Sequence, residues 1–116
     1  MNPITKKKMS VLGIGFTVLF FCLPAFATST ISIKRQAELI HLLKQDCGSC
    51  HGMTLKGGLG PALTIEALAG KTPTFLQQAV LDGRAGTPMP PWRGLLSESE
   101  VAWLVERLIK GETDEH

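Results

Sequence analysis

The sequence has little of what marks nucleic-acid-binding and multidomain proteins. Tyrosine is absent, and aromatic residues make up only 6% of the 116 residues. No stretch interleaves aromatic with basic side chains, as a groove for single-stranded nucleic acid requires. No internal repeat is visible, and no segment alternates apolar and polar residues with the period of a β-strand. We therefore expect one all-α domain that does not bind nucleic acid.

The longest apolar run is too short to span a membrane. It covers residues 11–23, about 13 residues, whereas a transmembrane helix needs about 20. Three lysines at positions 6–8 precede it and the small-x-small sequence Ala25-Phe26-Ala27 follows it, in the order typical of a secretory signal. The sequence thus predicts a signal peptide over residues 1–27, export to the periplasm, and a mature domain over residues 28–116 without stable membrane association. An uncleaved N-terminal anchor is the alternative.

Positive charge and cysteine are both scarce in the predicted mature chain. Residues 1–27 hold three of the 12 basic residues and none of the 10 acidic ones, so the formal net charge changes from +2 for the whole chain to about −1 for residues 28–116. No basic patch remains that would attract nucleic acid. Of the three cysteines, only Cys47 and Cys50 lie in the mature chain.

Helical periodicity covers most of the mature chain. It predicts a helix from about residue 33 into the cysteines, a short helical turn over 64–68, a helix over 72–83 and a last helix over 97–111. Glycine and proline predict loops over 52–61 and 83–94, and the prolines should hold the second loop stiff and extended. The apolar stripes of these helices are the expected core: Ile33, Ala37, Leu39, Ile40, Leu43, Phe75, Leu76, Ala79, Val80, Val101, Leu104, Val105 and Leu108.

The cysteines belong to a CxxCH motif, Cys47-Gly48-Ser49-Cys50-His51. This is the signature of c-type haem attachment. On a helical turn the two thiols at i and i+3 lie on one side and can reach the two vinyl groups of one porphyrin, and the histidine at i+4 projects to the iron. The motif therefore predicts one covalently bound haem c with His51 as an iron ligand.

Three other uses of the cysteines remain as alternatives. A zinc site needs four ligands, and the sequence has no second CxxC and no paired histidines. A thioredoxin-like redox pair requires a βαβ context, which the pattern lacks. A plain disulfide would leave His51 without a role.

Methionine is the expected second axial ligand of the iron, and the mature chain has only two methionines. Met53 lies too close to His51 in sequence to reach the other face of a haem. Met89 has enough chain between it and the motif, and prolines flank it on both sides. We therefore predict Met89 as the ligand, with His41 or His116 as the alternatives.

Several residues near these ligands are candidates for supporting the haem. A metal-bound histidine usually donates its other ring N–H to a carbonyl, and Pro61 is the candidate acceptor. Trp92 should either cover the haem or pack under the loop. Arg84 and Arg93 flank the same loop and could pair with haem propionates, or else remain solvated surface charges. Trp103 is expected in the core against the first helix.

The order of these features over residues 33–110 resembles class I cytochrome c. The segments that carry the resemblance are Cys47–Gly52, Gly60–Leu63 and Thr87–Trp92, between two amphipathic helices. Residues 46–61, together with Leu81–Arg84, are in addition similar to the NirC family, small periplasmic cytochromes of denitrification. The resemblance implies three to four helices around one haem, axial ligands at His51 and Met89, and thioether bonds at Cys47 and Cys50.

The NirC resemblance implies two functions, and the chemistry leaves a third open. The first is a monomeric shuttle that donates single electrons to dissimilatory nitrite reductase. The second is an accessory role in the synthesis or insertion of haem d-one for that reductase. The third is a peroxidase-like enzyme, which would need Met89 to leave the iron; six-coordinate iron has no open site, so we expect an electron carrier and not an enzyme.

Overall fold

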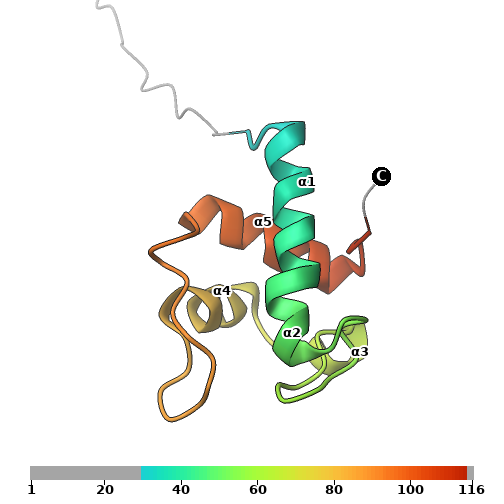
Figure 1. The fold of residues 1–116 in the computed structure, drawn as a ribbon, viewed down its shortest axis with the longest axis vertical. Helices are drawn as coiled ribbons and strands as arrows, with labels where there is room; N and C mark the ends of the chain where they lie inside the picture. The colour runs from blue at the N-terminus through green and yellow to red at the C-terminus, as the bar shows by residue number, and fades with distance from the viewer. Residues whose placement is uncertain (1–29, 115–116) are drawn as a thin grey trace, which may run out of the picture.

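The computed structural model describes residues 30–114, and the regular structure in this range is entirely helical. The expected all-α fold is therefore confirmed (Figure 1). The elements in chain order are α1 (Ile33–Leu42), η1 (Leu43–Cys47), α2 (Gly48–His51), α3 (Ile65–Leu68), α4 (Pro73–Asp82) and α5 (Glu98–Lys110). None of the described helices combines the length and the hydropathy needed to cross a membrane. The predicted signal peptide and His116 lie outside the described residues.

The first three elements form one helical rod that ends at the CxxCH motif. The hydroxyl of Ser32 accepts a hydrogen bond from the Arg35 N–H and caps the start of α1. At η1 the rod widens into a π-helical turn, in which the N–H of Gly48 bonds to the carbonyl of Leu43, five residues earlier. The predicted helix is thus confirmed, but periodicity did not reveal the wider turn.

The last helix has the clearest start and stop signals. Ser97 and Glu100 form a reciprocal capping box at the start of α5, and Gly111 ends the helix in the left-handed conformation. The two capping residues are the ends of the helix predicted over residues 97–111. The four residues of its predicted apolar stripe are buried: Val101, Leu104, Val105 and Leu108.

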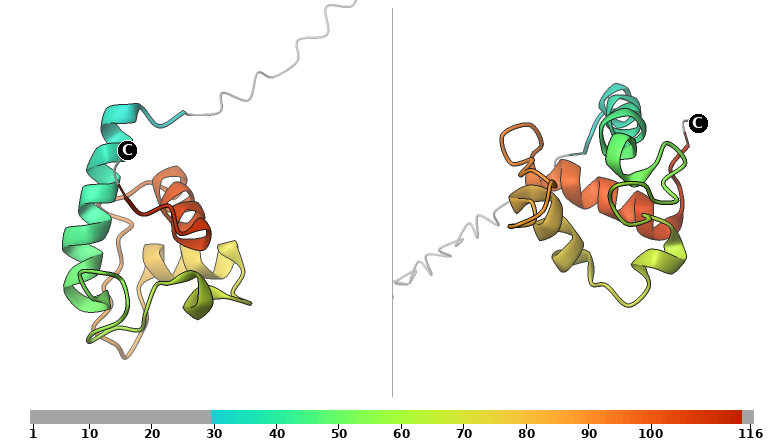
Figure 2. Two further views of the ribbon diagram at one scale, coloured as in Figure 1. Left: turned by 90° about the vertical axis from the view of Figure 1, so that its right-hand side faces the viewer. Right: turned by 60° about the horizontal axis from the view of Figure 1, so that its bottom comes forward.

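The core gathers around α5, which packs against α4, α3 and α1. Figure 1 shows α5 crossing behind α1, and Figure 2 shows α4 below α5. Three expectations were wrong: Ile33 is 85% exposed, and Ala37 and Phe75 are also exposed. Ile33 and Ala37 line a surface hollow that α1 shares with Trp103 and Arg107 of α5. The expected core also lacked four leucines that are buried: Leu55, Leu68, Leu81 and Leu96.

The connection from α4 to α5 is held by hydrogen bonds as well as by prolines. It is not extended throughout, because residues 84–87 form a turn in which Thr87 bonds to the carbonyl of Arg84 through both N–H and hydroxyl. Gly86 takes a positive φ of 76° that permits this turn. Farther along, the N–H of Trp92 bonds to the last carbonyls of α4, Val80 and Leu81. The loop is therefore closed on itself before Met89 and bound to the end of α4 after it.

Candidate haem site

The CxxCH motif lies at the lower end of the helical rod in Figure 1. Cys47 ends η1, and Cys50 and His51 belong to α2. Cys47 is half-buried, Cys50 is exposed, and His51 is the buried polar side chain of the described residues, with 9% of its surface accessible. Both cysteines carry free thiols. The rod thus presents two thiols and an imidazole at one end.

The imidazole of His51 is oriented by a backbone carbonyl. Its Nδ1 lies 2.7 Å from the carbonyl oxygen of Pro61, so Nδ1–H donates to that oxygen. The second ring nitrogen, Nε2, is then free of a proton and can bind a metal ion. The hydrogen bond expected at Pro61 is present.

The loop after the motif folds back onto the end of the rod. The N–H groups of Gly57 and Gly60 donate to the carbonyls of His51 and Cys50, at 2.7 and 2.8 Å. These two carbonyls would otherwise be unpaired at the helix end. Gly60 packs directly on the imidazole, because a Cβ added there would lie 2.9 Å from Nδ1 of His51. Glycine-richness predicted a loop but not this contact.

The Cys47 thiol is not an activated nucleophile. Burial raises its pKa to about 11, and the nearby carboxylate of Asp46 adds to the effect. Reactive cysteines of redox enzymes have a pKa lowered from the usual range. The described residues also contain no strand, so the βαβ context of a thioredoxin-like redox pair is missing from residues 30–114.

A largely apolar cavity opens beside the motif. It has an outer part of about 510 Å³ and an inner part of about 160 Å³. Six residues line both parts, which joins them into one cavity: Cys47, His51, Pro61, Arg84, Met89 and Trp92. Cys50 lines the outer part. Leucine and valine side chains from α4 and α5 line the inner part, among them Leu76, Val80, Leu104 and Val105.

The structure thus brings together at one cavity the two cysteines, His51, Pro61, Met89 and Trp92. Met89 is half-buried, and its backbone is fixed by hydrogen bonds from Arg84 N–H to its carbonyl and from its own N–H to the Thr87 hydroxyl. Trp92 both packs on the core and lines the cavity, so its two expected roles are not exclusive. Met53 and His41 are exposed and line neither part.

The two arginines of the loop behave differently. Arg93 bonds to the carboxylates of Asp82 and Glu98, at 2.8 and 3.0 Å, away from the cavity lining. Arg84 lines the cavity, and its guanidinium lies 5.7 Å from the centre of the Phe75 ring. Lys71 also lines the inner part, a position that sequence reasoning missed. The only feature of the sequence that could have pointed to Lys71 is its position just before Thr72-Pro73, where α4 starts.

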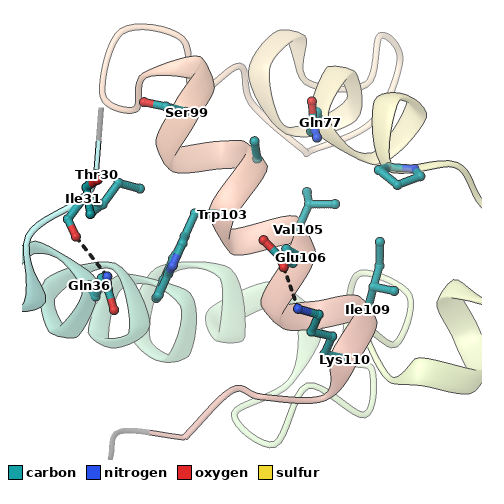
Figure 3. Close-up of a pocket in the computed structure, with 12 residues that line it drawn as sticks. Thr30, Ile31, Gln36, Gln77, Ser99, Trp103, Val105, Glu106, Ile109 and Lys110 are labelled. Carbon is teal, nitrogen blue, oxygen red and sulfur yellow. Dashed lines mark hydrogen bonds and ion pairs between the residues drawn. The ribbon is translucent and has the colours of Figure 1, made fainter. Parts of the chain in front are cut away.

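A second hollow of about 660 Å³ lies elsewhere, between α5, the start of α4 and the entry to α1 (Figure 3). None of the predicted site residues lines it. Its two charged side chains, Glu106 and Lys110, bond to each other. Trp103 lines it, half-buried beside α1, with the Arg107 guanidinium 4.9 Å from its ring centre. We find no chemistry-bearing group there, and no cluster of three metal-ligating side chains within residues 30–114.

The comparisons with known proteins agree with this geometry. The family described as cytochrome c oxidase, cbb3-type, subunit III matches residues 34–106. Cytochrome c55X from Pseudomonas aeruginosa is 58% identical over 102 residues, which are 87% of this chain and 86% of the relative. A solved structure of c-type cytochrome NirC is 62% identical, with a TM-score of 0.70, and the match covers 72% of this chain and 99% of the other. The chain belongs to the NirC-like c-type cytochromes.

The residues of this NirC-like cytochrome fit the covalent haem c that its family implies. Two thiols, an imidazole with one nitrogen already bonded and an apolar cavity are what such a group requires. A longer protein shares part of the fold: dihydro-heme d1 dehydrogenase from Pseudomonas aeruginosa is 35% identical over 69 residues, 60% of this chain but 14% of that protein. In that relative, the matching segment is a small part of a larger chain.

Proposed function

We propose that this protein carries one haem c and transfers single electrons. Cys47 and Cys50 would hold the haem through thioether bonds, and His51 Nε2 and the Met89 thioether would be the axial ligands. The observation that carries the proposal is the cavity, which both ligands line and at which the His51 ring is already fixed by Pro61. The haem supplies a one-electron redox couple when bound.

The residues around the cavity favour an electron carrier over an enzyme. With histidine and methionine both bound, the iron would have no open position for a substrate. The backbone of Met89 is held by hydrogen bonds with Arg84 and Thr87, which opposes dissociation of the Met89 side chain from the iron. With a haem in place, the apolar side chains of the inner wall would keep water away from the iron. These features support electron transfer and disfavour the peroxidase-like alternative.

The proposed partner is dissimilatory nitrite reductase in the periplasm. The match to cytochrome c55X and NirC supports a place in denitrification. Residues 1–27 would direct export and then be cleaved off. The functional domain would be residues 28–116. We expect this domain to act as a monomer and to donate electrons to the reductase in transient complexes.

The relative that processes haem d1 supports a second candidate. A segment similar to this chain is built into dihydro-heme d1 dehydrogenase. A free protein of this kind could therefore serve haem d1 synthesis or insertion, by exchanging electrons with a protein that holds the immature haem.

Deleting the gene in a denitrifying host separates the two candidates. If the protein is an electron donor, the nitrite reductase purified from the mutant contains its full d-type haem, but nitrite reduction in cells is slow. If it is a maturation factor, the purified reductase lacks d-type haem. A reductase with normal haem and normal turnover in cells would exclude both roles.

Covalent haem is tested on the purified protein alone. Extraction with acidified acetone should leave the red colour with the polypeptide, and the Cys47→Ala, Cys50→Ala variant should lose it. A colourless wild-type protein would contradict the proposal at its first step.

A further inference from the structure

Most cationic side chains of the described residues are bound to carboxylates. Five of the nine lysines and arginines in residues 30–114 form such ion pairs. Four form none with a carboxylate of this range: Lys34, Lys56, Lys71 and Arg84. Two of these four, Lys71 and Arg84, line the cavity.

Lys71 and Arg84 border the same stretch of cavity wall, although they flank opposite ends of α4. The Arg84 guanidinium reaches back to 5.7 Å from the centre of the Phe75 ring, in the first turn of α4. The Lys71 ammonium lies just before that helix, where it donates to the Ala67 carbonyl at 2.6 Å. Lys71, Phe75 and Arg84 all line the inner part of the cavity. We call Lys71 and Arg84 the cationic rim. The carboxylate that lines the cavity, Asp46, belongs to the outer part beside Cys50.

A haem brings two propionate carboxylates to the site, and their burial against apolar walls is costly unless cations pair with them. Arg93 cannot supply this charge without giving up Asp82 and Glu98. Building on the proposed function, we infer that the cationic rim receives the haem propionates and holds the reduction potential high. A positive charge near the haem favours the reduced iron, which carries one positive charge less than the oxidised iron.

The test measures reduction potentials of the mature haem-loaded protein. Arg84→Gln and Lys71→Gln should each lower the potential, so that at fixed ambient potential the ratio of oxidised to reduced protein rises several-fold to about tenfold; tenfold corresponds to 59 mV for one electron. Arg84→Lys keeps the charge and should remain near the wild-type potential. Arg93→Gln and Lys34→Gln are matched controls that remove a cation elsewhere and should change the ratio much less.

The absorption spectrum separates a failure of this inference from a failure of the proposed function. If Arg84→Gln and Lys71→Gln keep the wild-type potential while the sulfur-to-iron charge-transfer band is intact, the cationic rim does not receive the propionates. The same holds if Arg93→Gln lowers the potential equally, because the effect would then be one of overall charge. If Arg84→Gln fails to incorporate haem, the reduction potentials of Lys71→Gln and Arg84→Lys still test whether the cationic rim receives the propionates. A wild-type protein without covalent haem would overturn the proposed function itself.

Discussion

At the scale of single residues, the contact between Gly60 and the His51 ring leaves no room for a side chain. A Cβ on Gly60 would lie 2.9 Å from both Cε1 and Nδ1 of His51. We expect Gly60→Ala to displace the ring, weaken its bond to the Pro61 carbonyl and lower the unfolding free energy by about 1–3 kcal/mol. Denaturant unfolding of the haem-loaded protein measures this change.

Gly94→Ala is the matched control for that substitution. A Cβ at Gly94 meets nothing within 4 Å. Its effect should stay within about 0.5 kcal/mol, as for ordinary surface positions. Equal unfolding free energies for Gly60→Ala and Gly94→Ala would contradict the close packing on His51.

The two methionines give a second prediction at this scale. Met89→Ala should abolish the sulfur-to-iron charge-transfer band of the oxidised protein and lower the reduction potential, because a thioether ligand favours ferrous iron. Met53→Ala should change neither, since Met53 is 59% exposed and lines no part of the cavity. Absorption spectra and redox titration measure both properties. A band that survives Met89→Ala would assign the iron's second ligand to another residue.

Sequence reasoning located the residues of the site through local chemistry and missed those that depend on tertiary contacts. The CxxCH spacing predicted His51 as a metal ligand. Because such a histidine usually donates its other ring N–H to a carbonyl, the contact with Pro61 could also be predicted. Nothing local distinguishes Arg84 from Arg93, because the difference arises from Asp82 on α4 and Glu98 on α5. Lys71 was missed because its position at the cavity also depends on tertiary contacts.

At the scale of elements, Glu100 joins the start of α5 to α1. One carboxylate oxygen accepts from Arg35 Nε at 2.6 Å, and the other accepts from the Ser97 N–H at 2.8 Å. The hydrogen bond from Arg35, and next that from Ser97, lowers the pKa of Glu100 below its usual 4.5. Since the pKa is lower in the folded than in the unfolded protein, the stabilisation is complete at neutral pH and is lost as the pH falls below the usual value.

We therefore expect Glu100→Gln to reduce the acid sensitivity of the fold. The loss of unfolding free energy between about pH 7 and about pH 3 should be smaller in this variant than in the wild type. Glu98→Gln is the control, because the Glu98 carboxylate is largely exposed and its pair with Arg93 is screened by solvent. If both variants show the wild-type pH dependence, the bond between α1 and α5 does not contribute to it.

The elements themselves were predictable where capping chemistry is local. Ser97, Glu100 and Gly111 marked both ends of α5, and Thr72 with Pro73 marked the start of α4. The π-helical turn of η1 was not predictable, because a hydrogen bond to the carbonyl five residues earlier does not require particular residue types. The exposure of Ile33 depends on how tightly the start of α1 packs against its neighbours, which periodicity cannot report.

At the scale of the whole molecule, the haem cavity takes the place of part of a hydrophobic core. The predicted mature chain, residues 28–116, is small, and domains of this size bury a modest fraction of their surface. Much of the apolar surface that α4, α5 and the Met89 loop turn inward lines the cavity. A haem in this cavity would complete the core, so we expect the polypeptide to depend on it for folding.

The Cys47→Ala, Cys50→Ala variant tests this dependence, because it removes both attachment points and leaves the helix-forming sequence nearly unchanged. We expect its far-ultraviolet circular dichroism to show most of the helical signal lost at neutral pH, with no cooperative thermal transition. Wild-type polypeptide produced without haem attachment should give the same spectrum, which shows that the alanines are not the cause. A near-native helical signal with a sharp transition in either protein would mean that α1, α4 and α5 form a sufficient core by themselves.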